Sequence, residues 1–170
     1  RGRKGGGVIR AAVVTVSDRS FRKERADASG PAVSALLAAI PADVEQEVVV
    51  PDVVACIGRA LRHFADVLGL DLVVTTGGTG VDPRDVTPEA TREVIDREVP
   101  GMAEAMRAAS QKAVPTAMLS RAVAGIRGQT LIVNLPGSPK GVRENLGVIL
   151  PALPHALSKL KGDPTDCGQP

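Results

Sequence analysis

The chain alternates between short, almost wholly apolar runs and longer stretches in which apolar residues recur every three or four positions. The run at 8–16 (VIRAAVVTV) is rich in β-branched residues, as are the runs at 44–50 and 70–75. Runs of this length and composition predict β-strands that are covered on both faces. Between them, the apolar spacing predicts helices over 30–39 and 53–68, the first opened by the pair Gly30-Pro31.

The order strand, helix, strand, helix, strand predicts a parallel sheet with right-handed crossovers. A fourth strand is expected in TLIVNL (130–135), followed by a helix from about 139 to about 160, and further helices over 88–97 and 101–111. The segments 122–126 and 129–133 flank Arg127-Gly128 and predict a hairpin that adds an antiparallel edge strand. The expected fold class is an α/β, three-layer α/β/α sandwich with a mostly parallel, doubly wound sheet and an antiparallel edge hairpin.

Length and composition favour one domain and argue against two kinds of partner. A chain of 170 residues suits a single domain over 8–162, with a flexible basic arm at 1–7 and a disordered tail at 163–170. A net charge of +2 with two Phe and neither Trp nor Tyr argues against a nucleic-acid partner. No apolar run approaches the roughly 18 residues that span a bilayer, so we expect no membrane association and a cytoplasmic location.

The ends of the predicted strands carry the candidate chemistry. Parallel strands end at the same edge of a sheet, so 17–20 (SDRS), 51–52 (PD), 77–85 (GGTGVDPRD) and 134–141 (NLPGSPKG) should meet there. Gly77, Gly78 and Gly80 allow positive φ and expose N–H groups that could surround a phosphate. The alternative is that these glycines only make a tight turn. Neither GxxxxGK[ST] nor the dinucleotide GxGxxG pattern is present.

Four aspartates follow strands at this edge: Asp18, Asp52, Asp82 and Asp85. Carboxylates beside an anion site are unfavourable unless they share a cation, and Mg²⁺ binds carboxylates together with phosphate oxygens and waters. Structural alternatives exist for three of them: a turn for Asp82, a helix cap for Asp18, and the position before a helix for Asp52. Asp85 lacks such a role, because the Thr-Pro pair at 87–88 already supplies a cap and a first helical residue.

The segment NLPGSPKG predicts a second anion site, at the N-terminus of a helix with Lys140 in its first turn. Ser138 is interpreted as an N-cap rather than a nucleophile, because no His is near in sequence and Gly-x-Ser-x-Gly is absent. Two anion sites and a carboxylate cluster without Cys or His machinery favour phosphoryl or nucleotidyl transfer onto a phosphate that is already ionised.

Five segments, in this order between residues 8 and 160, carry a family resemblance: TVSDR, VPD, TTGGTGVDPRDVTPEAT, VPTAMLSR and LIVNLPGSPKG. Together they resemble the molybdopterin adenylyltransferase family (MogA/MoaB-like) of molybdenum cofactor biosynthesis. The resemblance implies transfer of AMP from Mg-ATP to the terminal phosphate of molybdopterin, with release of pyrophosphate. It also implies a homotrimer and a hand-off of the product to a molybdenum-insertion protein.

The same resemblance assigns roles to individual residues. It implies that Asp52 and Asp85 are the catalytic carboxylates and the Mg²⁺ ligands. It places nucleotide and substrate binding on Ser17, Asp18, Thr76, Gly77, Gly78, Thr79 and Gly80, and the pterin phosphate end on Ser120, Asn134, Pro136, Gly137, Ser138 and Lys140. Two alternatives stay open: a non-catalytic molybdopterin-binding or scaffold homologue, and a nucleotide-processing hydrolase built on the related domain of competence-damage-type proteins.

Overall fold

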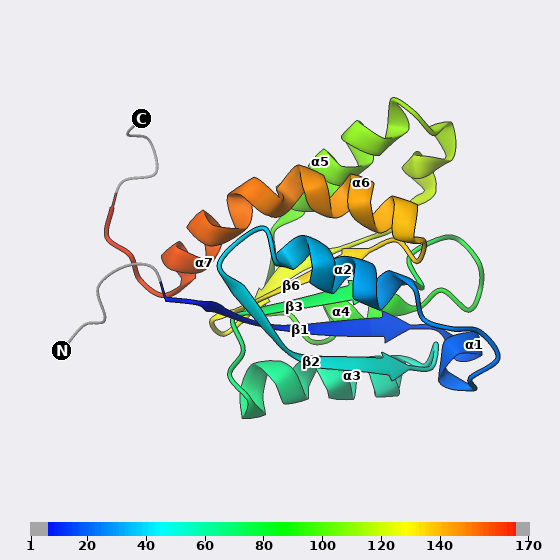
Figure 1. The fold of residues 1–170 in the computed structure, drawn as a ribbon, viewed down its shortest axis with the longest axis horizontal. Helices are drawn as coiled ribbons and strands as arrows, with labels where there is room; N and C mark the ends of the chain where they lie inside the picture. The colour runs from blue at the N-terminus through cyan, green and yellow to red at the C-terminus, as the bar shows by residue number, and fades with distance from the viewer. Residues whose placement is uncertain (1–6, 166–170) are drawn as a thin grey trace.

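The computed structural model describes residues 7–165, which form one six-stranded sheet in the order β2-β1-β3-β6-β5-β4 (Figure 1). The strands β1 (Ile9–Val16), β2 (Ala42–Val50), β3 (Leu72–Thr76) and β6 (Thr130–Leu135) are parallel. The strand β5 (Ala124–Arg127) is antiparallel to β6, and β4 (Arg97–Glu98) is antiparallel to β5. The predicted fold class is confirmed. Residues 1–6 of the predicted arm and 166–170 of the predicted tail lie outside the described residues.

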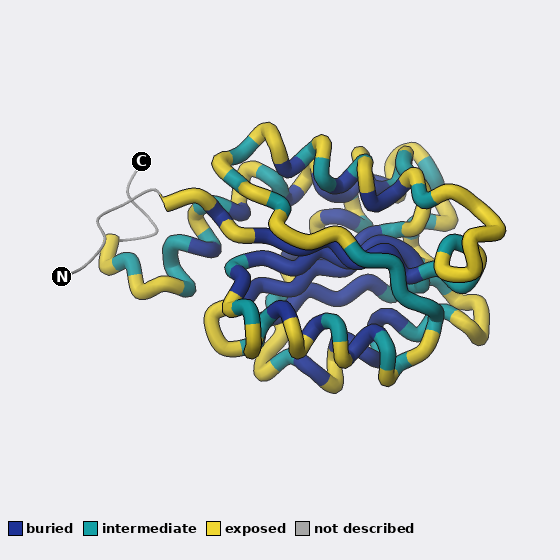
Figure 2. Tube along the Cα trace, turned by 60° about the horizontal axis from the view of Figure 1, so that its bottom comes forward, coloured by how far each residue is buried: buried dark blue, intermediate teal, exposed yellow. Residues whose placement is uncertain are grey.

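Alternating side chains of the central strands divide the core between two helical layers. Ala11 and Val13 of β1 pack with α2 (Ser29–Leu37), α5 (Pro100–Gln111), α6 (Pro139–Ile149) and α7 (Leu153–Leu160). Ala12 and Val14 pack on the other face with α3 (Val54–Arg62) and α4 (Thr87–Arg92). Figure 2 shows the central strands buried between these layers, which explains why they are apolar throughout. In residues 7–165, no helix is both long and apolar enough to cross a membrane.

The edge of the sheet differs from the prediction. The hairpin forms as expected around Gly128, whose φ is +56°. However, β4 pairs outside β5, so the hairpin is not the outermost element. The helix predicted to reach residue 97 ends at Arg92, because the Asp96 amide donates to the Ile126 carbonyl (2.7 Å) and Arg97 pairs with β5. Pairing with a distant strand thus overrides the local helical pattern.

Two predicted helices are not α-helical over their whole length, and two short helices were not predicted. The helix over 53–68 forms as α3 and then widens into a π-helical turn, His63–Val67. The helix over 139–160 is divided by a 3-10 turn, Leu150–Ala152, where Pro151 and Pro154 lack the N–H that a continuous helix needs. The short helices are α1 (Asp18–Phe21) and a 3-10 helix, η2 (Pro115–Leu119).

The parallel strands end level with one another, and this places the candidate site. Val16 of β1 lies beside Val50 of β2, Thr15 lies beside Thr76 of β3, and Thr76 lies beside Leu135 of β6. The four segments that follow these strands therefore start at the same edge, which we call the carboxyl edge of the sheet.

Candidate functional site

A cavity of about 440 Å³ opens at the carboxyl edge of the sheet. Segments after β1, β2, β3 and β6 all contribute to it, as the strand order predicts. Eight of the predicted site residues line it: Ser17, Asp52, Thr76, Gly77, Gly78, Asp85, Gly137 and Ser138. Asp18, Thr79, Gly80, Ser120, Asn134, Pro136 and Lys140 do not line it, and their positions are described below.

The segment 77–80, the glycine loop, is held from behind and leaves amides free. Gly77 and Gly78 have φ of +102° and +66°, which favours residues without a Cβ. Their carbonyls accept hydrogen bonds from the Thr87 hydroxyl (2.9 Å) and the Thr87 amide (3.1 Å), respectively. Among the described residues, no acceptor is bonded to the amides of Gly78, Thr79 and Gly80. These N–H groups form the kind of backbone array that binds an anion.

The end of β6 supports the glycine loop from the side. The Thr76 hydroxyl donates to the Pro136 carbonyl (2.6 Å), and the Gly77 amide donates to the Leu135 carbonyl (3.0 Å). Gly137 packs so closely that a Cβ on it would lie 3.2 Å from the Gly77 Cα. The two predicted anion-binding turns are therefore in direct contact.

Asp18 and Asp52 bind each other's backbone rather than capping helices. The Asp18 amide donates to the Asp52 carboxylate (2.8 Å), and the Asp52 amide donates to the Asp18 carboxylate (2.9 Å). The cap of α1 is Ser17, whose hydroxyl accepts from the Ser20 amide (3.2 Å). The cap position of α3 is Val53, which makes no side-chain bond. The capping alternative for Asp18 is therefore wrong, whereas Asp52 does lie just before α3, as its alternative predicted.

The environment of Asp52 disfavours its negative charge. Burial raises the pKa of the Asp52 carboxyl above its usual value, and the negative charges of Asp18 and Asp85 raise it further. The hydrogen bond from the Asp18 amide and the positive charge of Arg84 oppose this increase. A cation between Asp52 and Asp85 would relieve the repulsion. Within residues 7–165, no three His, Cys, Asp or Glu side chains are grouped to hold a metal ion by themselves.

Asp85 lines the cavity, whereas the Asp82 side chain makes hydrogen bonds within the turn. The Asp85 carboxylate accepts from the Asp82 amide (3.1 Å), and the Asp85 amide donates to the Asp82 carbonyl (2.8 Å). The Asp82 carboxylate is exposed and accepts from the Arg84 amide (2.9 Å), so the turn alternative holds for Asp82. Thr87 does not cap α4 as predicted, because it lies inside the helix and its hydroxyl bonds Gly77.

The segment after β6 contributes its backbone and Ser138, but not its lysine. Ser138 is the N-cap of α6, and its hydroxyl accepts from the Gly141 amide (3.0 Å), as predicted. The side chain of Lys140 is 73% exposed and lies 3.8 Å from Glu144. The geometry therefore gives Lys140 no contact with the cavity.

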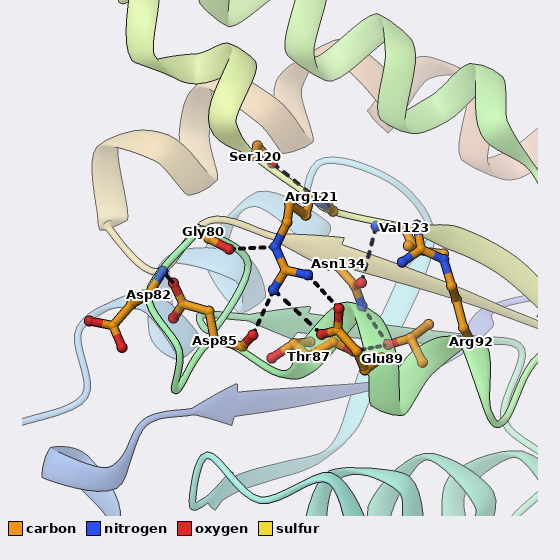
Figure 3. A network of polar contacts seen from close by, with 12 residues as sticks. Gly80, Asp82, Asp85, Thr87, Glu89, Arg92, Ser120, Arg121, Val123 and Asn134 are labelled. Atoms are coloured by element: carbon orange, nitrogen blue, oxygen red, sulfur yellow. Dashed lines mark hydrogen bonds and ion pairs between the residues drawn. The ribbon is translucent and has the colours of Figure 1, made fainter.

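Asn134 and Ser120 do not line the cavity. Asn134 is fully buried: its amide nitrogen donates to the Thr75 hydroxyl (3.0 Å) and the Thr91 hydroxyl (2.9 Å), and its oxygen accepts from the Val123 amide (3.1 Å) (Figure 3). All its polar atoms are thus used within the protein, and we assign it a supporting role rather than a ligand contact. The Ser120 hydroxyl accepts from the Ala122 amide at 3.4 Å.

Several residues at the site were missed by sequence reasoning. Asp27 lines the cavity, where its carboxylate accepts from the Thr15 hydroxyl (2.7 Å) and the Gly30 amide (3.0 Å). Its position three residues before Gly30 is a helix-start signal that could have identified it. Arg25 is the one cation among the described residues that line the cavity. Arg121 contacts the loop after β3; it is the last residue of VPTAMLSR, but no role was assigned to it from the sequence.

The raised pKa of Asp52 leads to a prediction about stability. The folded-state pKa lies above the unfolded value of about 3.9. Asp52 therefore favours folding most below that pH, and the contribution is lost as the pH rises through the folded-state pKa. Asp52→Asn removes the charge, so at neutral pH we expect the variant to be more stable than the wild type by less than about 1 kcal/mol, because water screens the half-buried carboxyl.

Urea unfolding over a pH series measures this difference, which should disappear as the pH falls below about 4. Asp82→Asn is the control of opposite sign. Hydrogen bonds from the Arg84 amide and side chain hold the pKa of Asp82 below its usual value, so its contribution is present above the unfolded pKa and lost on acidification. This variant should lose stability at neutral pH. Equal behaviour of the two variants would contradict the assignment of a desolvated charge to Asp52.

Comparisons with known proteins agree over most of the chain. The sequence model of a family described as "Probable molybdopterin binding domain" matches residues 12–155. A molybdopterin adenylyltransferase of Helicobacter pylori (strain J99) is 43% identical over 158 residues, covering 91% of this chain and 89% of that protein. That of Escherichia coli K12 is 42% identical over 168 residues, covering 91% and 86%. The crystal structure of the molybdopterin biosynthesis enzyme MoaB from Thermus thermophilus has a TM-score of 0.87 at 54% identity, covering 93% of this chain and 99% of that one.

Proposed function

Because this chain belongs to the family of molybdopterin-binding domains, we propose that it is a molybdopterin adenylyltransferase that works in molybdenum cofactor biosynthesis. In this proposal it transfers AMP from Mg-ATP to the terminal phosphate of molybdopterin and releases pyrophosphate. One observation carries the proposal: Gly78, whose amide has no acceptor among the described residues, lines a single cavity together with the carboxylates of Asp52 and Asp85. A Cβ on Gly78 would lie 3.2 Å from Asp52, and one on Gly80 would lie 2.8 Å from Asp85.

The chemistry of such a transfer matches what the residues can do. A phosphate oxygen of molybdopterin would bond to the α-phosphorus of ATP while the bond from that phosphorus to the pyrophosphate oxygen breaks. The attacking oxygen is already ionised, so the site needs no strong base and has to supply orientation and charge neutralisation. The glycine-loop amides would hold nucleotide phosphate. Thr87 contributes by bonding the backbone of that loop, and Thr76 by joining the end of β3 to the segment after β6.

The carboxylates suit a divalent cation that arrives with the nucleotide. Asp52 and Asp85 would hold Mg²⁺, which keeps waters and phosphate oxygens as its remaining ligands, and this agrees with a site that lacks a third protein ligand among the described residues. When bound, the ion would neutralise phosphate charge. Burial, together with repulsion from Asp18 and Asp85, raises the pKa of Asp52, and a cation beside these carboxylates would offset the repulsion.

Further properties stay predictions of the same proposal. We expect a homotrimer, a cytoplasmic location, and transfer of the product to a molybdenum-insertion protein. Sedimentation equilibrium of the purified chain would test the first of these directly.

A turnover assay tests the reaction itself. The purified protein is incubated with ATP and molybdopterin, with and without Mg²⁺, and adenylylated molybdopterin and pyrophosphate are quantified. Equal amounts of both products, formed only with the divalent cation, are expected. Tight molybdopterin binding without product would favour the scaffold alternative, and nucleotide hydrolysis that does not need molybdopterin would favour the hydrolase alternative.

A further inference from the structure

Arg121 makes a set of contacts that the proposed chemistry does not yet use. It follows η2 and lies against the loop between the glycine loop and α4 (Figure 3). Its Nε donates to the Gly80 carbonyl (2.7 Å), and its Nη2 donates to the Asp85 carbonyl (2.6 Å). Its backbone amide donates to the Thr79 carbonyl (2.8 Å). A single residue, remote in sequence, is thus bonded to three carbonyls of the segment 79–85.

The two carbonyls that the guanidinium binds are the two ends of the 80–85 loop. A guanidinium is planar and presents its donors in a fixed arrangement, so holding both carbonyls at once sets the separation of the loop ends. The separation matters because the middle of this loop is exposed: Val81, Asp82, Pro83 and Arg84 all face solvent. Little else in the described structure restrains the loop from outside.

The position of the Asp85 carboxylate depends on the conformation of that loop. Its oxygen accepts from the Asp82 amide (3.1 Å), and the Asp85 amide bonds the Asp82 carbonyl (2.8 Å). The same carboxylate lies close to Gly80, where a Cβ would be 2.8 Å from its oxygen. A change in the separation of the loop ends would therefore move the carboxylate relative to the glycine-loop amides.

Glu89 holds Arg121 in turn. Both Nη atoms of Arg121 are bonded to the Glu89 carboxylate, the Nη2 contact being 3.4 Å. Glu89 is in the first turn of α4, so the guanidinium connects that helix to the loop. The hydrogen bond with Arg121 holds the pKa of Glu89 below its usual value, as expected of a carboxylate paired with a guanidinium.

We propose that Arg121 is a positioning residue for adenylyl transfer, which holds the Asp85 carboxylate against the glycine-loop amides by fixing both ends of the 80–85 loop. The inference rests on the proposed function and adds a residue to it. Arg121 does not line the cavity, so in this proposal it acts through Asp85.

Arg121→Gln tests this role, with Arg127→Gln as the matched control. Arg127 also pairs with a carboxylate, Asp66 (2.8 and 2.6 Å), and donates to a carbonyl, that of Val94 (2.7 Å). It lies at the hairpin turn, at the opposite end of β6 from the cavity. Arg121→Gln removes an ion pair and two side-chain bonds to carbonyls, and Arg127→Gln removes an ion pair and one such bond, so losses of thermal stability of the same order are expected. Only Arg121→Gln should lower kcat, by about 100-fold, the effect of a misplaced group near the reacting atoms.

Three further readouts separate positioning from general destabilisation. KM for molybdopterin should change little in Arg121→Gln. In an Asp85→Asn background, the second substitution should change kcat by no more than about twofold, because the residue it positions is already lost. Hydrogen exchange at the amides of Asp82 and Asp85 should accelerate in Arg121→Gln and stay unchanged in Arg127→Gln. Equal kcat in the two single variants, or independent losses in the double variant, would overturn the inference.

Hydrogen exchange also distinguishes the two proposals. If the wild type shows no adenylyl transfer, the proposed function fails while the exchange data still show whether Arg121 holds the loop. If the wild type turns over and the 80–85 amides exchange equally in the wild type and Arg121→Gln, the positioning role fails while the function stands.

Discussion

Asp85→Asn is expected to lower kcat/KM for adenylyl transfer by roughly 100- to 1000-fold, the range seen when one positioned electrostatic group is removed from an active site. The asparagine oxygen can still accept from the Asp82 amide, so the loop conformation should persist. The substitution removes the negative charge beside Gly80 and, in the proposed mechanism, a ligand of the nucleotide-bound cation. The loss should therefore appear in turnover rather than in folding.

Asp82→Asn is the control for this prediction. It makes the same chemical change in the same loop, at a carboxylate that is exposed and does not line the cavity. We expect kcat/KM to stay within about threefold of the wild type, because an exposed charge of this kind interacts weakly through water. Steady-state kinetics at saturating Mg²⁺ would measure both variants. An Asp85→Asn protein with the activity of the Asp82→Asn protein would remove Asp85 from the mechanism.

Gly77→Ala is expected to destabilise the fold by about 3 kcal/mol or more. Its φ of +102° is a conformation that costs a residue with a side chain about 1–3 kcal/mol. In addition, a Cβ there would overlap the Val16 carbonyl oxygen at the end of β1, and a backbone atom in a central strand cannot move aside cheaply. A loss of this size corresponds to a fall in Tm of about 6–12 °C for a chain of this length.

Gly128→Ala separates the two causes. Its φ of +56° is also positive, but nothing lies within 4 Å of a Cβ at that position. The control should therefore show only the conformational cost, about 1–2 kcal/mol. Thermal unfolding of the two variants under the same conditions would give the difference. If they melted at the same temperature, the close approach between the glycine loop and β1 would contribute nothing to stability.

Much of the architecture follows from local patterns. β-branched runs predicted both ends of β1, β2, β3 and β6 to within two residues, because strands covered on both faces have to be apolar throughout. Right-handed crossovers between them then placed their carboxyl ends, and the segments that follow, at a single edge. Two features were not predicted correctly: the end of α4 at Arg92 and the position of β4 at the edge of the sheet. Both depend on pairing with β5.

The candidate site likewise has features that local sequence predicts and features that it does not. The glycines at 77 and 78 predict positive φ, and Ser138 before Pro139 predicts the start of a helix. Both predictions are possible because these conformations depend on residues that are near one another in the chain. The partners of polar side chains do not follow from such signals. Lys140 was expected to bind an anion, but its side chain lies beside Glu144. Asn134 was expected to lie at the pterin phosphate end, but it is fully buried.

By itself, the sequence determined where the four parallel strands and the hairpin form, and that a glycine loop and aspartates gather at one edge of the sheet. Only the tertiary structure decided that Asp18 and Asp52 bind each other's backbone across 34 positions, and that Arg121 reaches Gly80 and Asp85 across 41 and 36 positions. The physical reason is the range of the interactions. Backbone conformation responds to adjacent residues, whereas the partner of a polar side chain is chosen by which segments the packed sheet and helices bring within about 3 Å.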